Sequence, residues 1–404
     1  MGRRAGRLVA ERYDLEMKKI EIRECMDKMQ MLGRTFAAEN GGLFCNWTCS
    51  GVRFLFRGSS LAVRIRAYAS AEQELRPMTG AFESRETWPW AAVFVDDGEE
   101  PVRYFEADRP DDVYPLLVFG EEEVHTVTIR KITENAKGKL CLMEFYTDGE
   151  ILKPDREIFE SDEEAEHGTG RRKDVLHLEF IGDSITCGFG NMVNDANRMF
   201  YSVDENSWMA HPAVAARKLQ ADFSVIACSG IAATEGIGKF AYALPPMKYY
   251  YPYRDRMAQE MEGAVDEPVL WDFQEHVPDV IVLNLGTNDA TVIDLNGDTK
   301  AGVEKFEKDY FEFLQLLRRY NGPSPWIICA LGSLDYFLYD SIQKVAEQFA
   351  AAYQDDRISC FKYGRVRVND GLGACRHPYV TTQVRMGEEL AAYIRETLQG
   401  GTGK

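Results

Sequence analysis

The 404-residue sequence predicts an N-terminal all-β sandwich followed by a C-terminal α/β domain built on a parallel sheet. The length suits two domains of ordinary size. Residues 31–153 consist of short apolar segments rich in β-branched and aromatic residues and separated by turn residues, which is typical of a sandwich. Over residues 175–400, apolar strand-like segments alternate with helical ones, which indicates a parallel sheet covered by helices on both faces.

The expected strands of the sandwich follow one another without a long amphipathic helix between them. Turn sequences such as Arg57-Gly58-Ser59 and Asp148-Gly149 separate them. Residues 1–30 precede the sandwich as a charged lead that we expect to be helical or disordered. The strands are expected at Val52–Phe56, Leu61–Ala67, Ala91–Val95, Val102–Phe105, Leu116–Phe119, Val124–Ile132 and Leu140–Phe145.

A polar, charged linker over residues 154–174 is expected between the two domains. In an open parallel sheet, ligands bind beyond the carboxyl ends of the strands, so the residues directly after each strand are the candidates for chemistry. The strands of the α/β domain are expected at Leu176–Ile181, Ser224–Ala227, Val280–Leu285, Trp326–Ala330 and Ile358–Phe361, and its helices at Ser207–Leu219, Ala301–Arg319, Ser341–Tyr353 and Thr381–Leu398.

Acidic residues outnumber basic ones, with 65 Asp and Glu against 47 Lys and Arg, so the formal net charge is −18. This charge disfavours nucleic acid and anionic membranes as partners. No apolar run reaches the roughly 18 residues of a transmembrane helix, and the basic start lacks the apolar core of a signal peptide. Nine scattered cysteines without a CxxC pair indicate reduced thiols, no metal site and a cytoplasmic location.

Ser184 stands in the sequence Gly182-Asp183-Ser184-Ile185-Thr186, directly after the first expected strand of the α/β domain. A tight turn from a strand into a helix presents a hydroxyl at the edge of the sheet, and the helix N-terminus adds backbone N–H groups nearby. Ser184 is therefore a candidate nucleophile. The alternative is that Ser184 only caps the helix, as serine often does after a strand.

Gly230 and Asn288 follow the next two expected strands. A glycine at a strand end leaves its N–H unshielded, and the amide of Asn288, in Gly286-Thr287-Asn288-Asp289, could donate to an oxyanion. Both residue types are also common in turns. Together with the N–H of Ser184, these two residues form the candidate oxyanion hole.

His377 lies in a glycine-rich loop before the last expected helix, in Ala374-Cys375-Arg376-His377-Pro378. A histidine on a loop at the carboxyl edge of a sheet is a candidate general base. The alternative is an exposed loop residue without a role. The serine, glycine, asparagine and histidine come in a fixed order, each near a strand end, so the set is more specific than any one member.

In this order, the Gly-Asp-Ser, Gly, Gly-x-Asn-Asp and His blocks resemble those of the SGNH (GDSL-type) hydrolases, a superfamily of lipases and acylhydrolases. The string FIGDSITCGFGN at residues 180–191 resembles carbohydrate esterase family 2, whose members carry a jelly-roll-like sandwich before a three-layer SGNH domain. The resemblance covers residues 31–398. It implies a serine esterase that forms an acetyl-enzyme and removes O-acetyl groups from carbohydrates without a metal or cofactor.

The group that orients His377 departs from the pattern of many superfamily members, which carry an aspartate three residues before the histidine. Here that position is Ala374. Some esterases of this branch use a Ser–His dyad whose imidazole is held by a backbone carbonyl, and the resemblance leads us to expect that arrangement. Asp370 is the alternative orienter, although a glycine-rich loop separates it from His377.

Substrate contacts are predicted from an aromatic cluster in residues 240–253, where prolines favour a loop. Tyr249, Tyr250 and Tyr251 could stack on sugar rings, and Arg376 could line the entrance. The alternative is a loop that packs its aromatic rings inward. The expected substrates are acetylated xylo- or manno-oligosaccharides. The alternative functions are another acyl hydrolase, such as a thioesterase or lysophospholipase, and a non-catalytic carbohydrate-binding protein.

Overall fold

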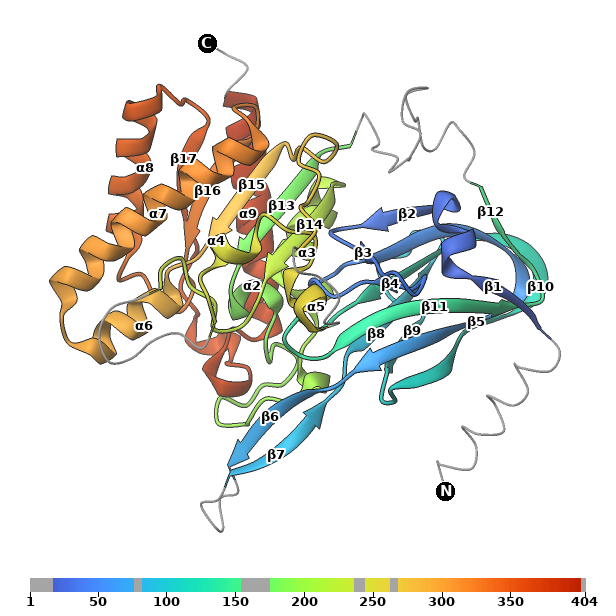
Figure 1. Cartoon of the computed structure of the whole chain (residues 1–404). Helices are drawn as coiled ribbons and strands as arrows, with labels where there is room; N and C mark the ends of the chain where they lie inside the picture. The colour runs from blue at the N-terminus through green and yellow to red at the C-terminus, as the bar shows by residue number, and fades with distance from the viewer. Residues whose placement is uncertain (1–16, 76–81, 154–174, 236–243, 262–267, 401–404) are drawn as a thin grey trace. The chain divides into compact units, whose positions relative to one another are not determined.

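The computed structural model describes residues 17–75, 82–153, 175–235, 244–261 and 268–400. The chain forms two compact units, Met1–Asp174 and Val175–Lys404 (Figure 1). Each unit has a hydrophobic core of its own. The predicted linker, residues 154–174, and the first 16 residues of the predicted lead lie outside the described residues.

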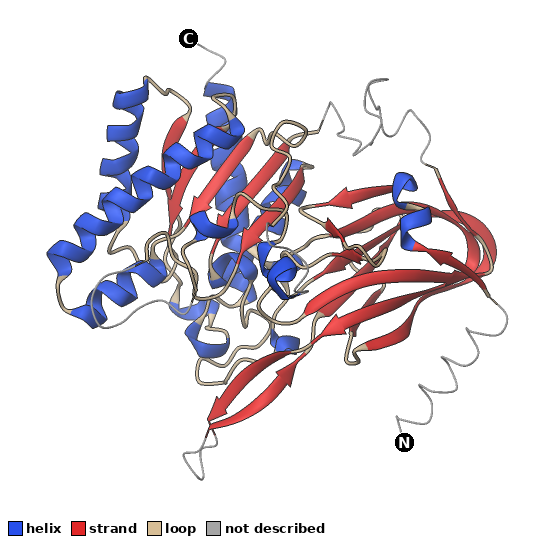
Figure 2. Ribbon diagram, viewed as in Figure 1, coloured by secondary structure: helices blue, strands red, loops and turns tan. Residues whose placement is uncertain are grey.

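The first unit is the predicted all-β domain (Figure 2). Its strands are β1 Lys18–Glu21, β2 Met29–Leu32, β3 Phe36–Ala37, β4 Leu43–Phe44, β5 Gly51–Tyr68, β6 Ser70–Leu75, β7 Phe82–Thr87, β8 Trp90–Val95, β9 Arg103–Glu106, β10 Asp111–Lys131, β11 Lys139–Thr147 and β12 Glu150–Leu152. The main sheet has the order β3-β4-β11-β5-β10-β8-β9, with β1 paired to β11 and both β2 and β12 paired to β5. β6 and β7 form a separate antiparallel hairpin.

Two strands of this unit are longer than the sequence pattern indicates. The turn expected at Arg57-Gly58-Ser59 lies inside β5, and the two strands expected within residues 116–132 are one strand, β10. The register of β10 against β5 shifts between Pro115 and Leu117 and again between Val118 and Glu123. Such bulges interrupt the alternation of side chains while the pairing continues, which explains why the sequence pattern divides the strand.

The prediction of a helical or disordered lead is wrong from Lys18 onward, because this segment belongs to the sheet. β1 pairs with β11, and two 3₁₀ turns, Ile22–Glu24 and Met26–Lys28, connect it to β2. Ile22 and Met29 are buried in the same core as the central strands. Exposed charged residues surround these buried side chains, so the composition of the segment does not indicate that β1 and β2 are strands.

The second unit is a five-stranded parallel sheet with helices, as predicted. Its strands are β13 His177–Gly182, β14 Asp222–Ala227, β15 Val280–Asn284, β16 Trp326–Leu331 and β17 Ile358–Lys362. Its helices are α2 Ser184–Cys187, α3 His211–Leu219, α4 Met247–Tyr250, α5 Arg256–Met261, α6 Thr287–Asn296, α7 Thr299–Asn321, α8 Tyr339–Tyr353 and α9 Val380–Gly400, with 3₁₀ turns at Ser202–Asp204, Ser207–Met209, Val368–Asp370 and Ala374–Arg376.

The sheet has the strand order β14-β13-β15-β16-β17. Helices α3 and α9 pack against each other and share a core with alternate residues of the strands. Helices α7 and α8 pack together, and α8 contacts β16 and β17 (Figure 1). Gly182 at the end of β13 is level with Ala227 of β14 and Asn284 of β15. The residues that follow these three strands therefore begin at one edge of the sheet.

Two further findings bear on the composition. Among the described residues, no helix combines the length and apolar character needed to cross a bilayer. All nine cysteines fall within the described residues, and none of them forms a disulfide. Eight of these side chains are at least partly buried, and Cys375 is exposed.

Candidate active site

Ser184 lies at the tight turn between β13 and α2. The N-cap of α2 is Asp183, whose Oδ1 accepts the N–H of Ile185 at 2.9 Å. The alternative interpretation of Ser184 as the helix cap is therefore wrong, and its hydroxyl is available for another partner. A glycine is needed at position 182, because a Cβ there would lie 2.0 Å from Oγ1 of Thr186.

The partner of the Ser184 hydroxyl is His377. Its Nε2 lies 2.9 Å from Oγ of Ser184, within the range of direct proton transfer. Its Nδ1 lies 3.2 Å from the carbonyl oxygen of Cys375. Because a carbonyl can only accept, we assign the proton to Nδ1, which leaves Nε2 as the basic nitrogen facing Ser184. The ring of Phe189 packs on the imidazole, with the ring centroids 4.5 Å apart.

The backbone before His377 adopts a conformation that is rare for residues other than glycine. Cys375 and Arg376 have φ angles of 51° and 64°, in the left-handed region. The N–H of Cys375 donates to the carbonyl of Arg198 at 3.0 Å, which ties this turn to a neighbouring loop. The turn places the Cys375 carbonyl against the imidazole two residues further along the chain.

Ala374 occupies the position at which many superfamily members carry an aspartate. It is fully buried, and its N–H donates to the carbonyl of Gly190 at 3.0 Å. A Cβ on Gly190 would lie 2.7 Å from the Cβ of Ala374. The close packing against Gly190 therefore leaves no room for the longer side chain of an aspartate at position 374.

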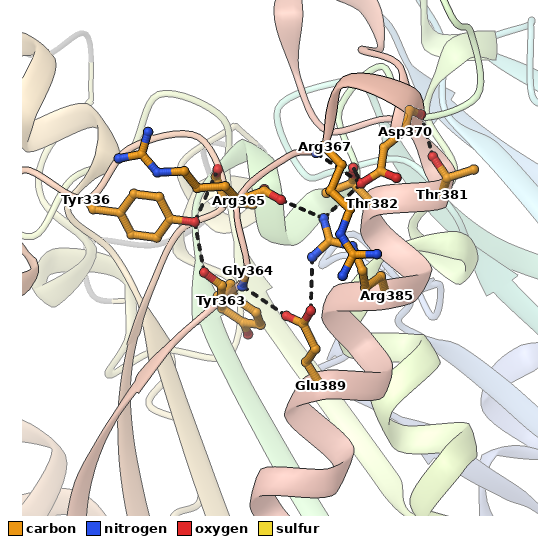
Figure 3. Close-up of polar contacts among 11 residues, drawn as sticks. Tyr336, Tyr363, Gly364, Arg365, Arg367, Asp370, Thr381, Thr382, Arg385 and Glu389 are labelled. Atoms are coloured by element: carbon orange, nitrogen blue, oxygen red, sulfur yellow. Dashed lines mark hydrogen bonds and ion pairs between the residues drawn. The ribbon is translucent and has the colours of Figure 1, made fainter.

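Asp370 does not orient His377, because its carboxylate faces α9. Oδ2 accepts hydrogen bonds from Nη2 of Arg385 at 2.9 Å and from Oγ1 of Thr382 at 3.3 Å (Figure 3). Burial raises the pKa of this carboxyl, but the bond from Arg385 and its neighbours outweigh burial and lower the pKa overall. The alternative with Asp370 as orienter is therefore wrong, and the carbonyl of Cys375 is the group at Nδ1.

Arg385 instead joins the loop after β17 to α9 (Figure 3). Its Nη1 bonds to Oε1 of Glu389 at 2.9 Å, and Oε2 of Glu389 accepts the N–H of Gly364 at 2.9 Å. Its Nη2 also donates to the carbonyl of Arg365 at 2.9 Å. The loop that leads to His377 is therefore fixed to α9 both at its start and at Asp370.

The candidate oxyanion donors follow three neighbouring strands. Gly230 has a φ of 78°, and no atom lies within 4 Å of the place where its Cβ would be. Within the described part of the chain, neither its N–H nor that of Ser184 has a hydrogen-bond acceptor. Nδ2 of Asn288 donates to the carbonyl of Ile231 at 2.8 Å, which uses one of its two N–H groups. Three N–H groups at this edge are therefore available to a negative charge.

Two of the three tyrosines predicted to bind substrate are core residues instead. Tyr250 is buried, and Tyr251 is fully buried, with its hydroxyl donating to Oε1 of Glu179 at 2.6 Å. The substrate-binding prediction is therefore wrong for these two, because the segment packs its rings inward around α4. Tyr249 is 37% exposed and lies under the guanidinium of Arg256. The first part of the predicted aromatic cluster, residues 240–243, lies outside the described residues.

Other exposed side chains lie in the loops that follow β16 and β17. Arg376 is exposed, next to His377. Phe337 is 51% exposed and Leu334 is 37% exposed, in the loop that follows β16. The sequence interpretation missed this pair and Phe189, although apolar residues directly after a strand of a parallel sheet are a usable signal. Within the described ranges, no group of three His, Cys, Asp or Glu side chains could hold a metal ion.

Comparison with known families accounts for both units. The carbohydrate esterase 2 N-terminal family matches residues 31–154. The GDSL-like lipase/acylhydrolase family matches residues 180–371. The two matched ranges correspond to the two units of the structure, and the second range, which contains the Ser184 turn, is similar to the GDSL-like lipases and acylhydrolases. The chain therefore resembles, in order, a carbohydrate esterase 2 N-terminal domain and a GDSL-like domain.

Individual relatives agree with this domain composition. The cellulase/esterase CelE of Acetivibrio thermocellus is 28% identical over 379 residues, which cover 91% of this chain and 39% of the relative. This chain therefore spans only about two fifths of that relative. An acetylxylan esterase / glucomannan deacetylase of Cellvibrio japonicus is 25% identical over 294 residues, covering 65% of this chain and 73% of the relative.

A solved structure extends the similarity to three dimensions. A family two carbohydrate esterase from Clostridium thermocellum, in complex with cellohexaose, matches with a TM-score of 0.72 and 25% identity. The match covers 92% of this chain and 99% of the esterase. The predicted fold class, a β-domain before an SGNH-type α/β domain, is thereby confirmed.

Proposed function

We propose that this chain is a serine esterase that removes O-acetyl groups from carbohydrates. The observation that carries the proposal is the contact of 2.9 Å between Oγ of Ser184 and Nε2 of His377, with Nδ1 held by a carbonyl. An aligned base of this kind is what a serine hydroxyl needs to become a nucleophile.

In the proposed reaction, Nε2 of His377 takes the proton of Ser184 while Oγ attacks the acetyl carbonyl carbon. The carbonyl oxygen becomes an oxyanion, which the N–H groups of Ser184, Gly230 and Asn288 stabilise. The tetrahedral intermediate then expels the sugar oxygen, which takes the proton from His377. A water molecule then gives a proton to Nε2 of His377 and attacks the carbonyl carbon of the acetyl-enzyme. The bond to Oγ of Ser184 breaks, Oγ takes the proton back from His377, and acetate is released. No step requires a metal or cofactor.

The substrate class is proposed from the relatives and from the site. One relative is named acetylxylan esterase / glucomannan deacetylase, another is named cellulase/esterase, and a similar structure holds cellohexaose. The exposed ring of Phe337 offers an aromatic face of the kind that stacks on sugar rings. We therefore propose acetylated xylo- and manno-oligosaccharides as substrates.

The experiment is acetate release from acetylated xylo- and manno-oligosaccharides by the wild type, Ser184→Ala and Ser324→Ala. Ser324 is a matched control, because it precedes β16 at the opposite edge of the sheet. Release that is lost only in Ser184→Ala supports the proposal. Hydrolysis of thioesters or long-chain acyl esters in preference to acetyl esters would favour another acyl hydrolase. Sugar binding without any turnover would favour a binding protein.

A further inference from the structure

Asp289 follows Asn288 at the start of α6, and its side chain is fully buried. Its two carboxylate oxygens accept different backbone N–H groups. Oδ2 accepts the N–H of Ala233 at 3.1 Å, and Oδ1 accepts the N–H of Thr234 at 3.0 Å. The donors lie three and four residues after Gly230. The carboxylate of Asp289 therefore holds the segment that begins with the candidate oxyanion donor.

The neighbouring bonds show how completely this segment depends on α6. Asn288 donates to the carbonyl of Ile231 at 2.8 Å, and the N–H of Met247 donates to the carbonyl of Ala232 at 3.0 Å. Residues 231–234 are all buried. Because a buried segment cannot exchange these bonds for water, losing one of them should displace it. Gly230, at the exposed end of the segment, should move with it.

Two titratable groups of α7, Asp309 and Tyr310, interact electrostatically with Asp289. Asp309 of α7 accepts the hydroxyl of Thr234 and an ion pair from Lys305, and Lys248 of α4 lies 3.7 Å from it. Burial raises the pKa of Asp309, but the bonds from Lys305 and Thr234 outweigh burial, so its pKa is lowered and it stays ionised. Tyr310 of α7 is the other titratable neighbour, and burial raises its pKa.

Asp289 itself has no cation as a direct partner within the described residues. Burial raises the pKa of Asp289 to about 7, the negative charge of Asp309 adds to this rise, and the two N–H donors oppose it. The ionised carboxylate can accept both N–H groups. The protonated carboxyl cannot do so equally well, because its hydroxyl oxygen is a weak acceptor and its proton needs an acceptor of its own.

We propose that Asp289 is a positioning residue whose ionised carboxylate holds the Gly230–Thr234 segment in place, and whose protonation releases it. In the released state, the N–H of Gly230 no longer faces the oxyanion, so turnover falls although Ser184 and His377 keep their contact. The effect on turnover rests on the proposed esterase function. The hydrogen bonds from Ala233 and Thr234 to Asp289 do not depend on that function.

The first experiment is the pH dependence of kcat for the wild type, Asp289→Asn and Asp279→Asn. If both His377 and Asp289 must lose a proton for full turnover, log kcat of the wild type should fall toward acid with a slope that approaches two over about the first 100-fold of loss. Below that range the slope should return to one, because the enzyme with protonated Asp289 keeps the residual turnover of Asp289→Asn. Asp289→Asn should have a slope of about one, an unchanged KM, and a kcat about 100-fold lower at high pH, the order expected for a small misplacement. The control residue, Asp279, also accepts a backbone N–H, that of His177 at 2.8 Å. It directly precedes β15 and therefore lies at the opposite edge of the sheet. Asp279→Asn should keep the wild-type slope.

A second measurement needs no turnover. In the amide NMR spectrum of the wild type, the N–H resonances of Ala233 and Thr234 should titrate together between about pH 5 and pH 9, because a charged acceptor becomes a neutral one. The same resonances should not titrate in Asp289→Asn. Absence of this titration in the wild type, or equal slopes of log kcat in the wild type and Asp289→Asn, would overturn the proposal. If the wild type releases no acetate but the two amides titrate, the esterase function fails and the hold by Asp289 stands.

Discussion

Two loops at the carboxyl edge of the second unit's sheet carry candidate catalytic groups but are held in different ways. The turn before His377 is partly exposed and depends on the left-handed backbone at Cys375 and Arg376. The segment from Gly230 to Thr234 is buried beyond its first residue and is tied to α6 by the side chains of Asn288 and Asp289. Side-chain chemistry should therefore matter most beside the second loop, and backbone conformation beside the first.

Asn288→Ala tests the second loop and should lower turnover more than substitutions at Cys375 or Asp370. It removes the side-chain N–H that we propose as an oxyanion donor, so kcat should fall about 10²–10³-fold. It also leaves the carbonyl of Ile231 without its donor, so the melting temperature should fall too. Steady-state kinetics with an acetyl ester measures the first effect, and thermal unfolding measures the second.

The matched control for this substitution is Asn296→Ala. Nδ2 of Asn296 donates to the carbonyl of Val292 at 2.9 Å, an equivalent bond at the other end of α6. The control should lower stability and leave kcat unchanged. If Asn288→Ala behaves in the same way, Asn288 is a turn residue without a role in turnover.

Cys375→Val tests the backbone of the first loop. A β-branched residue strongly disfavours the left-handed conformation that Cys375 adopts, and strain of this kind is worth about 1–3 kcal/mol. We expect kcat to fall about 10-fold, because the carbonyl of residue 375 no longer holds Nδ1 of His377.

Two variants at the same position separate the backbone from the thiol. Cys375→Gly suits the left-handed region, and Cys375→Ala removes only the sulfur atom. Both should keep kcat within about 3-fold of the wild type, given the small energies involved. Equal losses in the alanine, glycine and valine variants would show that the thiol matters and would contradict the backbone explanation.

Asp370→Ala should have the smallest effect on turnover, because Asp370 bonds to Arg385 and not to His377. We expect kcat to stay within about 3-fold of the wild type, whereas the loss of a triad acid costs about 10⁴-fold. A loss of that size would restore Asp370 as the orienter of the imidazole.

The same variant has a pH signature in stability. Burial by itself raises the pKa of Asp370, but the donors around it, Arg385 foremost, outweigh burial and hold the pKa below its ordinary value of 3.8. Its carboxylate therefore stabilises the fold above that value, and this stability is lost as the pH falls through the lowered pKa. Thermal unfolding should show a gap between the wild type and Asp370→Ala at neutral pH. The gap should close in strong acid.

The sequence was informative where local pattern and chemistry coincide. Alternation of apolar strands and helices predicted the parallel sheet. The residues after its strands gave Ser184, Gly230, Asn288 and His377 as candidates, and the structure brings Ser184 and His377 to 2.9 Å from each other. The assignment of Tyr250 and Tyr251 to the substrate failed because burial of an aromatic ring is decided by the elements that pack on it. Tyr251 is held by Glu179, which lies 72 positions away along the chain, so the local sequence does not show that this ring is buried.

Two other features were beyond the reach of residue patterns. The bulges of β10 break its alternation without ending the strand. The role of Asp289 depends on burial and on two N–H groups more than 50 positions away along the chain. The Gly-x-Asn-Asp motif marks the position but does not indicate which atoms the aspartate holds.

The carbonyl at Nδ1 of His377 also has a genetic consequence. A carboxylate that orients a histidine can be lost through a single nucleotide change, because only two amino acids supply one. A carbonyl is encoded by every sense codon, so most missense changes at codon 375 would leave this group in place. In a saturation mutagenesis library, position 375 should therefore accept glycine, asparagine and aspartate, which tolerate a positive φ, and reject valine, isoleucine and threonine.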